Sequence, residues 1–476
     1  MNSVSEDVNH STVHGLENSN GARAGEGPGE ARTRLPKNRV ELELLDKKPT
    51  MTPAEAKAEA DRCLYCQDAP CIKACPTEID IPTFIKKIAS DNVRGSAKTI
   101  FEQNLLGYSC SRVCPVEVLC VGSCVYNAWH REPIAIGRLQ RYATEQATAP
   151  GKPVLFTPKA PSRRKVALIG AGPASLSCAG YLALEGHQAV IFEKRAFAGG
   201  LNTTGIAPYK LHVEDSLHEV EWLEQLGVEV RTGVEVGKDV RGEDLLKDYD
   251  AVYIGVGLGE DTKLRIPGED GPGVFGATAW IETMKLAAVG ATKLGRVLVI
   301  GGGNTALDVA RECALLGAAE VSMVYRRDVA SMSGYAHELE GARKEGVRLV
   351  THATPVAFER DAQGKLTGLR VRRMAPPPQP SPGGGGGTNG AQLEEIIPCD
   401  TVALAIGQSK MHAIAAEFPG VALDAKGCIV ADPNNGATGH AKVFSGGDCI
   451  NGGKEVVNAV ADGRNTARHL DQLWSS

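Results

Sequence analysis

The chain has 476 residues, of which 42% are hydrophobic and 23% charged, and its formal net charge is −5. This length predicts about three domains, and the composition is ordinary for a globular protein. The negative charge gives no general attraction to nucleic acid or to an anionic membrane. No run approaches the roughly 18 apolar residues of a membrane span, and the acidic N-terminus (MNSVSEDVNHST) lacks the apolar core of a secretory signal. Disulfide-rich frameworks belong to small secreted chains, and this chain is neither small nor visibly secreted. A protein of the reducing cytoplasm is therefore expected.

The N-terminal part is predicted to be a disordered tail followed by a helical domain. Residues 1–38 hold almost no large apolar side chains, so they cannot bury a core. Thr52 as an N-cap, Pro53 at the first position and Glu55 in the first turn predict a helix over 52–62. Apolar spacing predicts further helices over 82–90, 96–104 and 138–147. Residues 39–150 are therefore expected to form a helical unit that carries two cysteine loops.

The two loops hold eight of the 13 cysteines. Their spacing is Cys63-x2-Cys66-x4-Cys71-x3-Cys75-Pro76 and Cys110-x3-Cys114-Pro115-x4-Cys120-x3-Cys124. Thiolates grouped in this way bind metal, and a Cys-Pro that closes a cysteine run is typical of iron–sulfur proteins. The eight thiolates suffice for two [4Fe–4S] clusters, with tetrahedral zinc as the alternative. The remaining cysteines stand alone and are expected to be packed spectators: Cys178, Cys313, Cys399, Cys428 and Cys449.

A first dinucleotide-binding fingerprint follows the helical unit. A strand over 166–170, a helix over 174–186 and a strand over 189–194 surround the turn Gly170-Ala171-Gly172-Pro173-Ala174-Ser175. The glycines allow a tight turn and a close approach of the backbone to a pyrophosphate on the helix N-terminus. Ser175 is small enough for close packing of the helix on the strand. Glu193, with Lys194 beside it, ends the second strand where an acidic side chain binds an adenosine ribose.

A second fingerprint repeats this pattern. A strand over 297–301 and a helix over 305–316 flank the turn Gly301-Gly302-Gly303-Asn304-Thr305-Ala306. The next strand, over 321–325, ends in Arg326 and Arg327, with no acid at the ribose position. Two guanidinium groups suit a 2′-phosphate, so NADPH is favoured over NADH. The alternative is that Arg327 pairs with Asp328 on the surface.

The C-terminal part supplies two more features. Strands are predicted over 251–256 and 401–407, and a strand from Val443 ends in Gly446-Gly447-Asp448. A helix then begins at Lys454. Flavoproteins with two dinucleotide domains use such an aspartate to hold the flavin ribityl chain, whereas the alternative is a simple turn in which Asp448 caps the helix. The Pro- and Gly-rich residues 375–390 are predicted to form a flexible loop without chemistry.

From about residue 39 onward the chain resembles the flavin- and cluster-bearing half of dihydropyrimidine dehydrogenase. The matching stretches are RCLYCQDAPCIKACP, SCSRVCPVEVLCVGSC, PIAIGRLQRYATE, ALIGAGPASLSCAGYLALEGH, AGGLNTTGIAPYKL, GGGNTALDVARE and FSGGDCINGGKEVV. The small subunit of glutamate synthase, which shares this architecture, is the main alternative. Gln140, inside IGRLQRY, favours the dihydropyrimidine family, in which a glutamine ligates the second cluster in place of a cysteine. A glutamate is expected there in the glutamate synthase relatives.

The resemblance also implies roles for individual residues. One cluster would be held by Cys63, Cys66, Cys71 and Cys124, and the other by Cys75, Cys114, Cys120 and Gln140. Cys110 would then hold no iron, although counting cysteines alone would make it a ligand. Lys210 would contact FAD, and Ser333 stands near the place where some relatives carry another basic residue for the 2′-phosphate, which leaves NADH open. Further cofactor contacts are expected at Gly200, Leu201, Val236, Ala405, Ile406, Gly407, Glu455 and Val456.

The expected fold class is α/β: a helical two-cluster domain of the alpha-helical ferredoxin type (39–150), followed by Rossmann-like FAD and NAD(P)H domains. The FAD domain is expected in two segments, 160–285 and 401–476, around an NAD(P)H domain of residues 286–400. The expected activity is that of an NAD(P)H-dependent flavin oxidoreductase, in which NADPH gives hydride to FAD and two [4Fe–4S] clusters carry single electrons onward. No side chain is assigned as a nucleophile.

The electron acceptor is expected on another polypeptide. In the full-length family enzyme, pyrimidine is reduced at an FMN on a TIM barrel of about 250 residues, for which this chain leaves no room. The expected partner is therefore an FMN-containing catalytic subunit of the dihydropyrimidine type, in a hetero-oligomer that serves pyrimidine degradation. Besides the glutamate synthase reading, a non-catalytic redox sensor or scaffold is the alternative from a different class.

Overall fold

The computed structural model describes residues 35–287, 294–373 and 393–475. Most of the tail predicted to be disordered (1–38), and the whole loop predicted over 375–390, lie outside the described residues. None of the helices within the described ranges is both long and apolar enough to cross a membrane.

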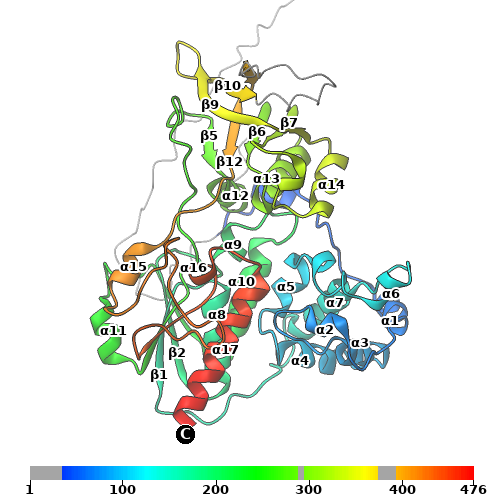
Figure 1. Cartoon of the computed structure of the whole chain (residues 1–476). Helices are drawn as coiled ribbons and strands as arrows, with labels where there is room; N and C mark the ends of the chain where they lie inside the picture. Colours follow the sequence, from blue (N-terminus) through cyan, green and yellow to red (C-terminus); the bar gives the residue numbers. More distant parts are fainter. Residues whose placement is uncertain (1–34, 288–293, 374–392, 476) are drawn as a thin grey trace, which may run out of the picture. The chain divides into compact units, whose positions relative to one another are not determined.

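Residues 53–148 form a helical domain (Figure 1). Its elements are α1 (Pro53–Asp61), α2 (Pro70–Lys73), α3 (Ile81–Ala89), α4 (Val93–Phe101), α5 (Gly107–Val113), η2 (Val116–Val118), α6 (Val125–Ala128) and α7 (Ile136–Thr148). The short η1 (Val40–Glu43), which the sequence placed in this domain, instead contacts α12 (Ala277–Leu286). Thr52 is the N-cap of α1, as predicted, and with Glu55 it forms a capping box: the Glu55 backbone N–H donates to Thr52 Oγ1, and the Thr52 backbone N–H donates to Glu55 Oε2. The predicted helices are confirmed, with ends shifted by a few residues.

The first parallel sheet carries the first glycine turn. Its order is β13-β4-β1-β2-β3, and every neighbouring pair is parallel. The strands are β1 (Lys165–Ile169), β2 (Gln188–Glu193), β3 (Glu229–Thr232), β4 (Ala251–Ile254) and β13 (Val443–Ser445). The associated helices are α8 (Pro173–Leu184), α9 (Leu201–Thr204), α10 (Val213–Glu224), α11 (Gly242–Asp248), α15 (His412–Ala416), α16 (Asp448–Asn451) and α17 (Val456–Ser475), and α8 lies beside α17 (Figure 1).

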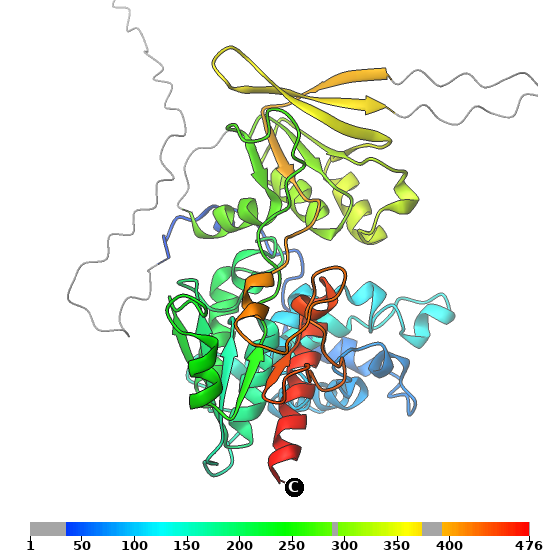
Figure 2. The same cartoon turned by 60° about the vertical axis from the view of Figure 1, so that its left-hand side comes forward.

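The second parallel sheet, with the order β5-β12-β6-β7-β8, carries the second glycine turn. Its strands are β5 (Val274–Gly276), β6 (Arg296–Ile300), β7 (Glu320–Val324), β8 (Arg348–Val350) and β12 (Thr401–Leu404). Its helices are α12 (Ala277–Leu286), α13 (Asn304–Leu315), η3 (Val329–Ser331) and α14 (Ala336–Lys344). Three antiparallel strands, yellow to orange in Figure 2, follow β8: β9 (Ala353–Arg360), β10 (Leu366–Arg373) and β11 (Leu393–Pro398).

These pairings confirm the predicted α/β fold class, but the boundaries of the domains differ from those predicted from the sequence. Strand β12 pairs with β5 and β6, so residues 401–404 belong to the second sheet although the sequence placed them in the FAD domain. Helix α12 also packs in the core of the second sheet, through Trp280 and Ile281. The NAD(P)H domain therefore begins near residue 274, because pairing over more than 120 residues, rather than local sequence, assigns β5 and β12 to one sheet.

The helical domain and the first sheet share one hydrophobic core. The rings of Phe101 and Trp222 stack with centroids 4.6 Å apart. A Cβ at Gly180 of α8 would lie 2.7 Å from a methyl carbon of Leu105, so the absence of a side chain lets the helical domain approach α8 closely. The cysteine loops and the first glycine turn therefore lie on elements that share one core.

Candidate functional site

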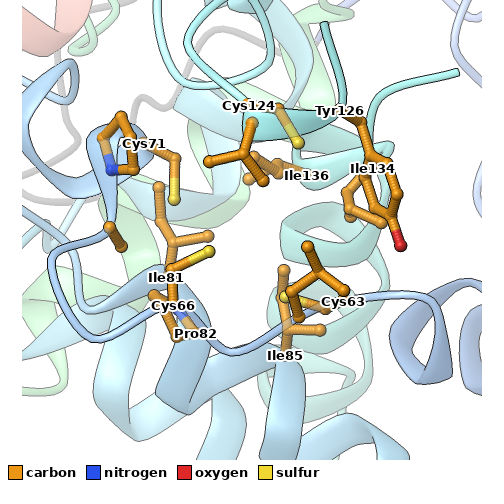
Figure 3. A pocket seen from close by; sticks show the side chains of 14 residues that line it. Cys63, Cys66, Cys71, Ile81, Pro82, Ile85, Cys124, Tyr126, Ile134 and Ile136 are labelled. Carbon is orange, nitrogen blue, oxygen red and sulfur yellow. The ribbon is translucent and has the colours of Figure 1, made fainter. Parts of the chain in front are cut away.

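Four cysteines from two loops surround one cavity in the helical domain (Figure 3). Cys63, Cys66 and Cys71 come from the first loop, and Cys124, immediately before α6, comes from the second. The rest of the lining is mainly apolar: Ala69, Pro70, Ile81, Pro82, Ile85, Val125, Ile134 and Ile136, with Leu64 and Tyr126 at its side. All four thiols are partly exposed. We call them the first sulfur group, and they are the four residues that the resemblance assigned to one cluster.

The second sulfur group consists of Cys75, Cys114 and Cys120, which interact electrostatically with one another. Cys110, on α5, hydrogen-bonds with the thiol of Cys114 and is 1% exposed. The structure therefore brings Cys110 to this group, although the resemblance left it without iron. Gln140, on α7, is also buried, and its Nε2 donates to the Gly107 carbonyl oxygen at 2.8 Å.

Burial raises the pKa of thiols in both sulfur groups. Among the residues that the structure describes, no three His, Cys, Asp or Glu side chains come together as a single-ion site. Burial and the neighbouring thiols raise the pKa of Cys71 and of Cys120 to about 12. Burial raises the pKa of the isolated cysteines in the same way, to about 12 for Cys399 and about 11 for Cys449, so the grouping of the sulfurs, and not their pKa, is what points to metal.

A cavity of about 1520 Å³ lies at the carboxyl ends of strands from both sheets. This is where open α/β sheets bind their ligands. Many residues predicted from the sequence line it: Gly170, Gly172, Pro173, Ala174, Glu193, Lys194, Gly200, Leu201, Lys210, Val236, Asn304, Thr305, Gly407, Gly447, Asp448, Lys454, Glu455 and Val456. Other predicted residues are not part of its lining: Ser175, Gly301, Gly303, Ala306, Arg326, Arg327, Ala405 and Ile406.

The first glycine turn forms a cradle for a phosphate. Gly170 has φ +84°, and a Cβ there would lie 3.0 Å from the Gly255 carbonyl oxygen. A Cβ at Gly200 would lie 2.7 Å from the Gly172 Cα, so two glycine backbones meet where a pyrophosphate would approach. Ser175 is fully buried beneath Gly255 and serves the close helix–strand packing predicted for it.

Two carboxylates stand at the walls of this cavity. Glu193 accepts hydrogen bonds from the backbone N–H groups of Ala171 (2.7 Å) and Arg195 (2.8 Å). Asp448 accepts from the Lys454 backbone N–H at 3.0 Å, and burial raises its pKa. Glu193 therefore closes the first turn while facing the place of an adenosine ribose, and Asp448 is held at the start of the helices that follow β13.

The second glycine turn is packed more tightly. A Cβ at Gly301 would lie 2.3 Å from the Ala405 carbonyl oxygen, and one at Gly302 would meet the ring of Tyr325 at 2.7 Å. Arg326 and Arg327 are exposed beyond the end of β7, and Arg327 Nε donates to the Tyr325 hydroxyl at 3.1 Å. Both guanidinium groups thus lie outside the large cavity and on solvent.

Lys210 has a different set of partners from the one that the resemblance implied. It lines the cavity, but its Nζ is 2.7 Å from both Asp308 Oδ1 on α13 and Glu338 Oε1 on α14. The ammonium group therefore bridges the two nucleotide domains. Asp308 lies within the stretch GGGNTALDVARE quoted above, but no role was expected for it, and Glu338 belongs to none of the matching stretches.

The cysteine loop reaches the same cavity. Val113 and Pro115, which flank Cys114, both belong to its lining. The second sulfur group therefore borders this cavity through the two neighbours of Cys114. The sequence did not identify this contact, since nothing local to Val113 or Pro115 indicates it.

Two protein families match the chain. Residues 42–152 match the family described as dihydropyrimidine dehydrogenase domain II, 4Fe-4S cluster. Residues 164–463 match the pyridine nucleotide-disulphide oxidoreductase family.

Individual relatives agree with these matches. The NADPH glutamate synthase small chain of Escherichia coli K12 is 34% identical over 441 residues, which cover 90% of this chain and 93% of that protein. The NAD-dependent dihydropyrimidine dehydrogenase subunit PreT of the same strain is 34% identical over 423 residues, covering 89% and 95%. Among solved structures, thioredoxin reductase of T. acidophilum superposes with a TM-score of 0.52 at 21% identity, over 66% of this chain and all of that one. This last likeness concerns the fold alone.

Proposed function

This chain belongs to the pyridine nucleotide-disulphide oxidoreductase family and carries a dihydropyrimidine dehydrogenase-type 4Fe-4S domain, and from this we propose that it is the electron-input subunit of a two-protein dihydropyrimidine dehydrogenase. Its cofactors would be FAD, NADPH and two [4Fe–4S] clusters. When bound, the flavin takes two electrons together from a reduced nicotinamide, and the clusters pass electrons on singly.

One observation carries this proposal: a single cavity is lined by the first glycine turn, by the start of α13 and by both neighbours of Cys114. The chain's residues can therefore hold a flavin, a nicotinamide dinucleotide and the second cluster next to one another. Gly170, Gly172 and Gly200 would admit the FAD pyrophosphate, and Glu193 would bind its ribose. Cys75, Cys114, Cys120 and Gln140 would hold the nearer cluster, and the first sulfur group the outer one.

The preference for NADPH is part of the proposal. The pair Arg326 and Arg327 supports it, because both guanidinium groups are exposed at the end of β7, where a 2′-phosphate would lie. The relatives differ here: the glutamate synthase small chain is named for NADPH and PreT for NAD. Replacing both arginines by glutamine should raise KM for NADPH far more than KM for NADH if this assignment is correct.

The dihydropyrimidine partner rests on Gln140. A glutamine here fits the dihydropyrimidine reading, and the second candidate, a glutamate synthase small subunit, is kept because that relative covers as much of the chain. Relatives of comparable length are named as a small chain or a subunit, which supports a hetero-oligomer.

The direct test uses the chain purified with its flavin and clusters. Without oxygen, NADPH should bleach the flavin absorbance rapidly and dyes should be reduced, while uracil is left unchanged. Uracil turnover by the isolated chain would refute the two-protein arrangement. A flavin that NADPH does not bleach would instead support the non-catalytic sensor or scaffold.

The partner is identified by pull-down from native extract followed by mass spectrometry. A stoichiometric FMN-containing protein of the dihydropyrimidine type would support the proposal. A large amidotransferase-type subunit would replace it with glutamate synthesis.

A further inference from the structure

A short segment that follows η3 and runs into the first turn of α14, residues Ser333–Glu338, lies over the second glycine turn. The Gly334 backbone N–H donates to the Gly302 carbonyl oxygen at 2.9 Å. The Tyr335 backbone N–H donates to Asn304 Oδ1, also at 2.9 Å. Asn304 is the first residue of α13, so the segment is attached to the helix N-terminus on which a pyrophosphate would rest.

The Tyr335 side chain crosses from this turn to the flavin side of the cavity. Its hydroxyl donates to Glu455 Oε1 at 2.6 Å. Glu455 precedes α17, and both side chains belong to the cavity lining together with Asn304. Burial and this hydrogen bond raise the pKa of Tyr335 to about 12. A neutral hydroxyl therefore meets a carboxylate, which is one of the stronger kinds of hydrogen bond.

The residues that follow keep Tyr335 in place. The His337 ring stacks on the Tyr335 ring with centroids 5.6 Å apart and an angle of 8°. His337 Nε2 lies 3.4 Å from Glu117 Oε2, and Glu117 belongs to η2, within the second cysteine loop. Glu338 forms the ion pair with Lys210 described above. One segment thus contacts the nucleotide turn, the helical domain and both walls of the cavity.

A bound dinucleotide has to pass this point. With its pyrophosphate at the start of α13, the dinucleotide would extend its nicotinamide end toward the flavin through the part of the cavity between Asn304 and Glu455, and Tyr335 spans that part. We propose that the Tyr335–Glu455 hydrogen bond is a gate that the nicotinamide half must open, so that Tyr335 is a positioning residue for this half of the dinucleotide. The inference rests on the proposed function, because it takes the cavity to bind a nicotinamide dinucleotide beside FAD.

The test compares the full holoprotein with the variant Tyr335→Phe, which keeps the ring and removes the hydrogen bond. Affinity for NADP⁺ is measured from the perturbation of the flavin spectrum. Because binding no longer breaks a hydrogen bond to a charged group, the dissociation constant should fall about tenfold. The affinity for 2′,5′-ADP, which lacks the nicotinamide half and does not reach the gate, should stay unchanged. Tyr249→Phe, outside the cavity lining, is the matched control.

A second variant, Glu455→Gln, and the double variant that carries both substitutions complete a double-mutant cycle. If the two side chains act as one gate, the double variant binds NADP⁺ no more tightly than either single variant, whereas independent effects would add. Unchanged or weaker NADP⁺ binding in both single variants would refute the gate, and so would an equal gain for 2′,5′-ADP. A wild-type protein that binds no NADP⁺ and whose flavin is not bleached by NADPH would refute the proposed function itself, and the gate with it.

Discussion

At the scale of single residues, Gln140 is oriented by a hydrogen bond to the helix that precedes Cys114. Its Nε2 donates to the Gly107 carbonyl oxygen at 2.8 Å, so the amide oxygen takes no part in this contact. An amide oxygen is the only atom of this side chain that can ligate iron, and it brings no negative charge. The ligand and its orienting contact together are what would tune the cluster.

Replacing Gln140 by cysteine or by glutamate should therefore change one cluster only. A thiolate or carboxylate makes the cluster more negative, so its reduction potential should fall and its EPR signal should change. The signal of the cluster held by the first sulfur group serves as the internal reference. If both signals stay as in the wild type, Gln140 is not a ligand, and the main support for the dihydropyrimidine partner is lost.

Cys110 and Cys114 form a matched pair of thiols for a second prediction. Both are in hydrogen-bond contact, yet only Cys114 is expected to hold iron. Cys114→Ser should lose about half of the bound iron, because one of two clusters is lost, whereas Cys110→Ser should keep all of it. Iron and acid-labile sulfide analysis measures both. Loss of a cluster from Cys110→Ser alone would make Cys110 the fourth ligand in place of Gln140.

At the scale of elements, helix α5 is joined to the flavin domain by a buried carboxyl group. Glu219 of α10 accepts hydrogen bonds from the Tyr108 and Ser109 backbone N–H groups, both at 3.0 Å, in the first turn of α5. Burial raises the pKa of Glu219 from 4.5 to about 7. The helix that leads to Cys114 is thus fixed by a group that titrates near neutral pH.

The shift predicts a pH dependence of stability. Between pH 4.5 and about 7 the folded protein binds a proton that the unfolded chain has released, so the stabilisation is complete below 4.5 and is lost as the pH rises through 7. Glu219→Gln cannot titrate, so its melting temperature relative to the wild type should rise by about 2–4 °C over this window. Glu243→Gln, at an exposed position on α11, is the control. A constant difference across the window would contradict the assignment.

The elements that could be predicted from the sequence are those with a local signature. The apolar runs of β1 and β6, the glycine turns and the capping box of α1 all depend on near neighbours in the chain. The sheet to which β12 belongs, and the partners of Lys285, depend on distant ones. Lys285 is fully buried, and its ammonium donates to the carbonyl oxygens of Asn202, Ile206 and Leu211. Because a lysine in a helix usually faces solvent, sequence alone gave no reason to expect this anchor between the nucleotide domains.

The same limit applies to the candidate site. The cysteine spacing and the glycine turns predicted which residues would meet, since each motif is compact. Tyr335 and Val113 reach the cavity only because three domains converge on it. The position of Arg326 and Arg327 outside the cavity also depends on how the loop after β7 turns.

At the scale of the whole molecule, the two sulfur groups differ in their contact with the large cavity. Val113 and Pro115 place the second group against it, and in that group Cys75 and Cys120 are each 9% exposed while Cys114 is partly exposed. All four thiols of the first group are partly exposed. Electrons from the flavin side should therefore reach the second group first and leave through the first, so that a partner docks on the side of the first group.

Two serine variants distinguish this order from independent transfer to either group. If NADPH can reduce both clusters, anaerobic titration should place about four electrons in the wild type, two on the flavin and one on each cluster. Either variant lacks one cluster and should take up about three electrons. Cys66→Ser should keep rapid reduction of the remaining cluster, because the group next to the cavity is intact. Cys114→Ser should still show rapid flavin bleaching but slow reduction of the remaining cluster, since the nearer group is broken. Freeze-quenched EPR after mixing with NADPH measures both rates. Equal rates in the two variants would mean that the first group exchanges electrons with the flavin directly, and the contact of Val113 and Pro115 with the cavity would then have no part in the route.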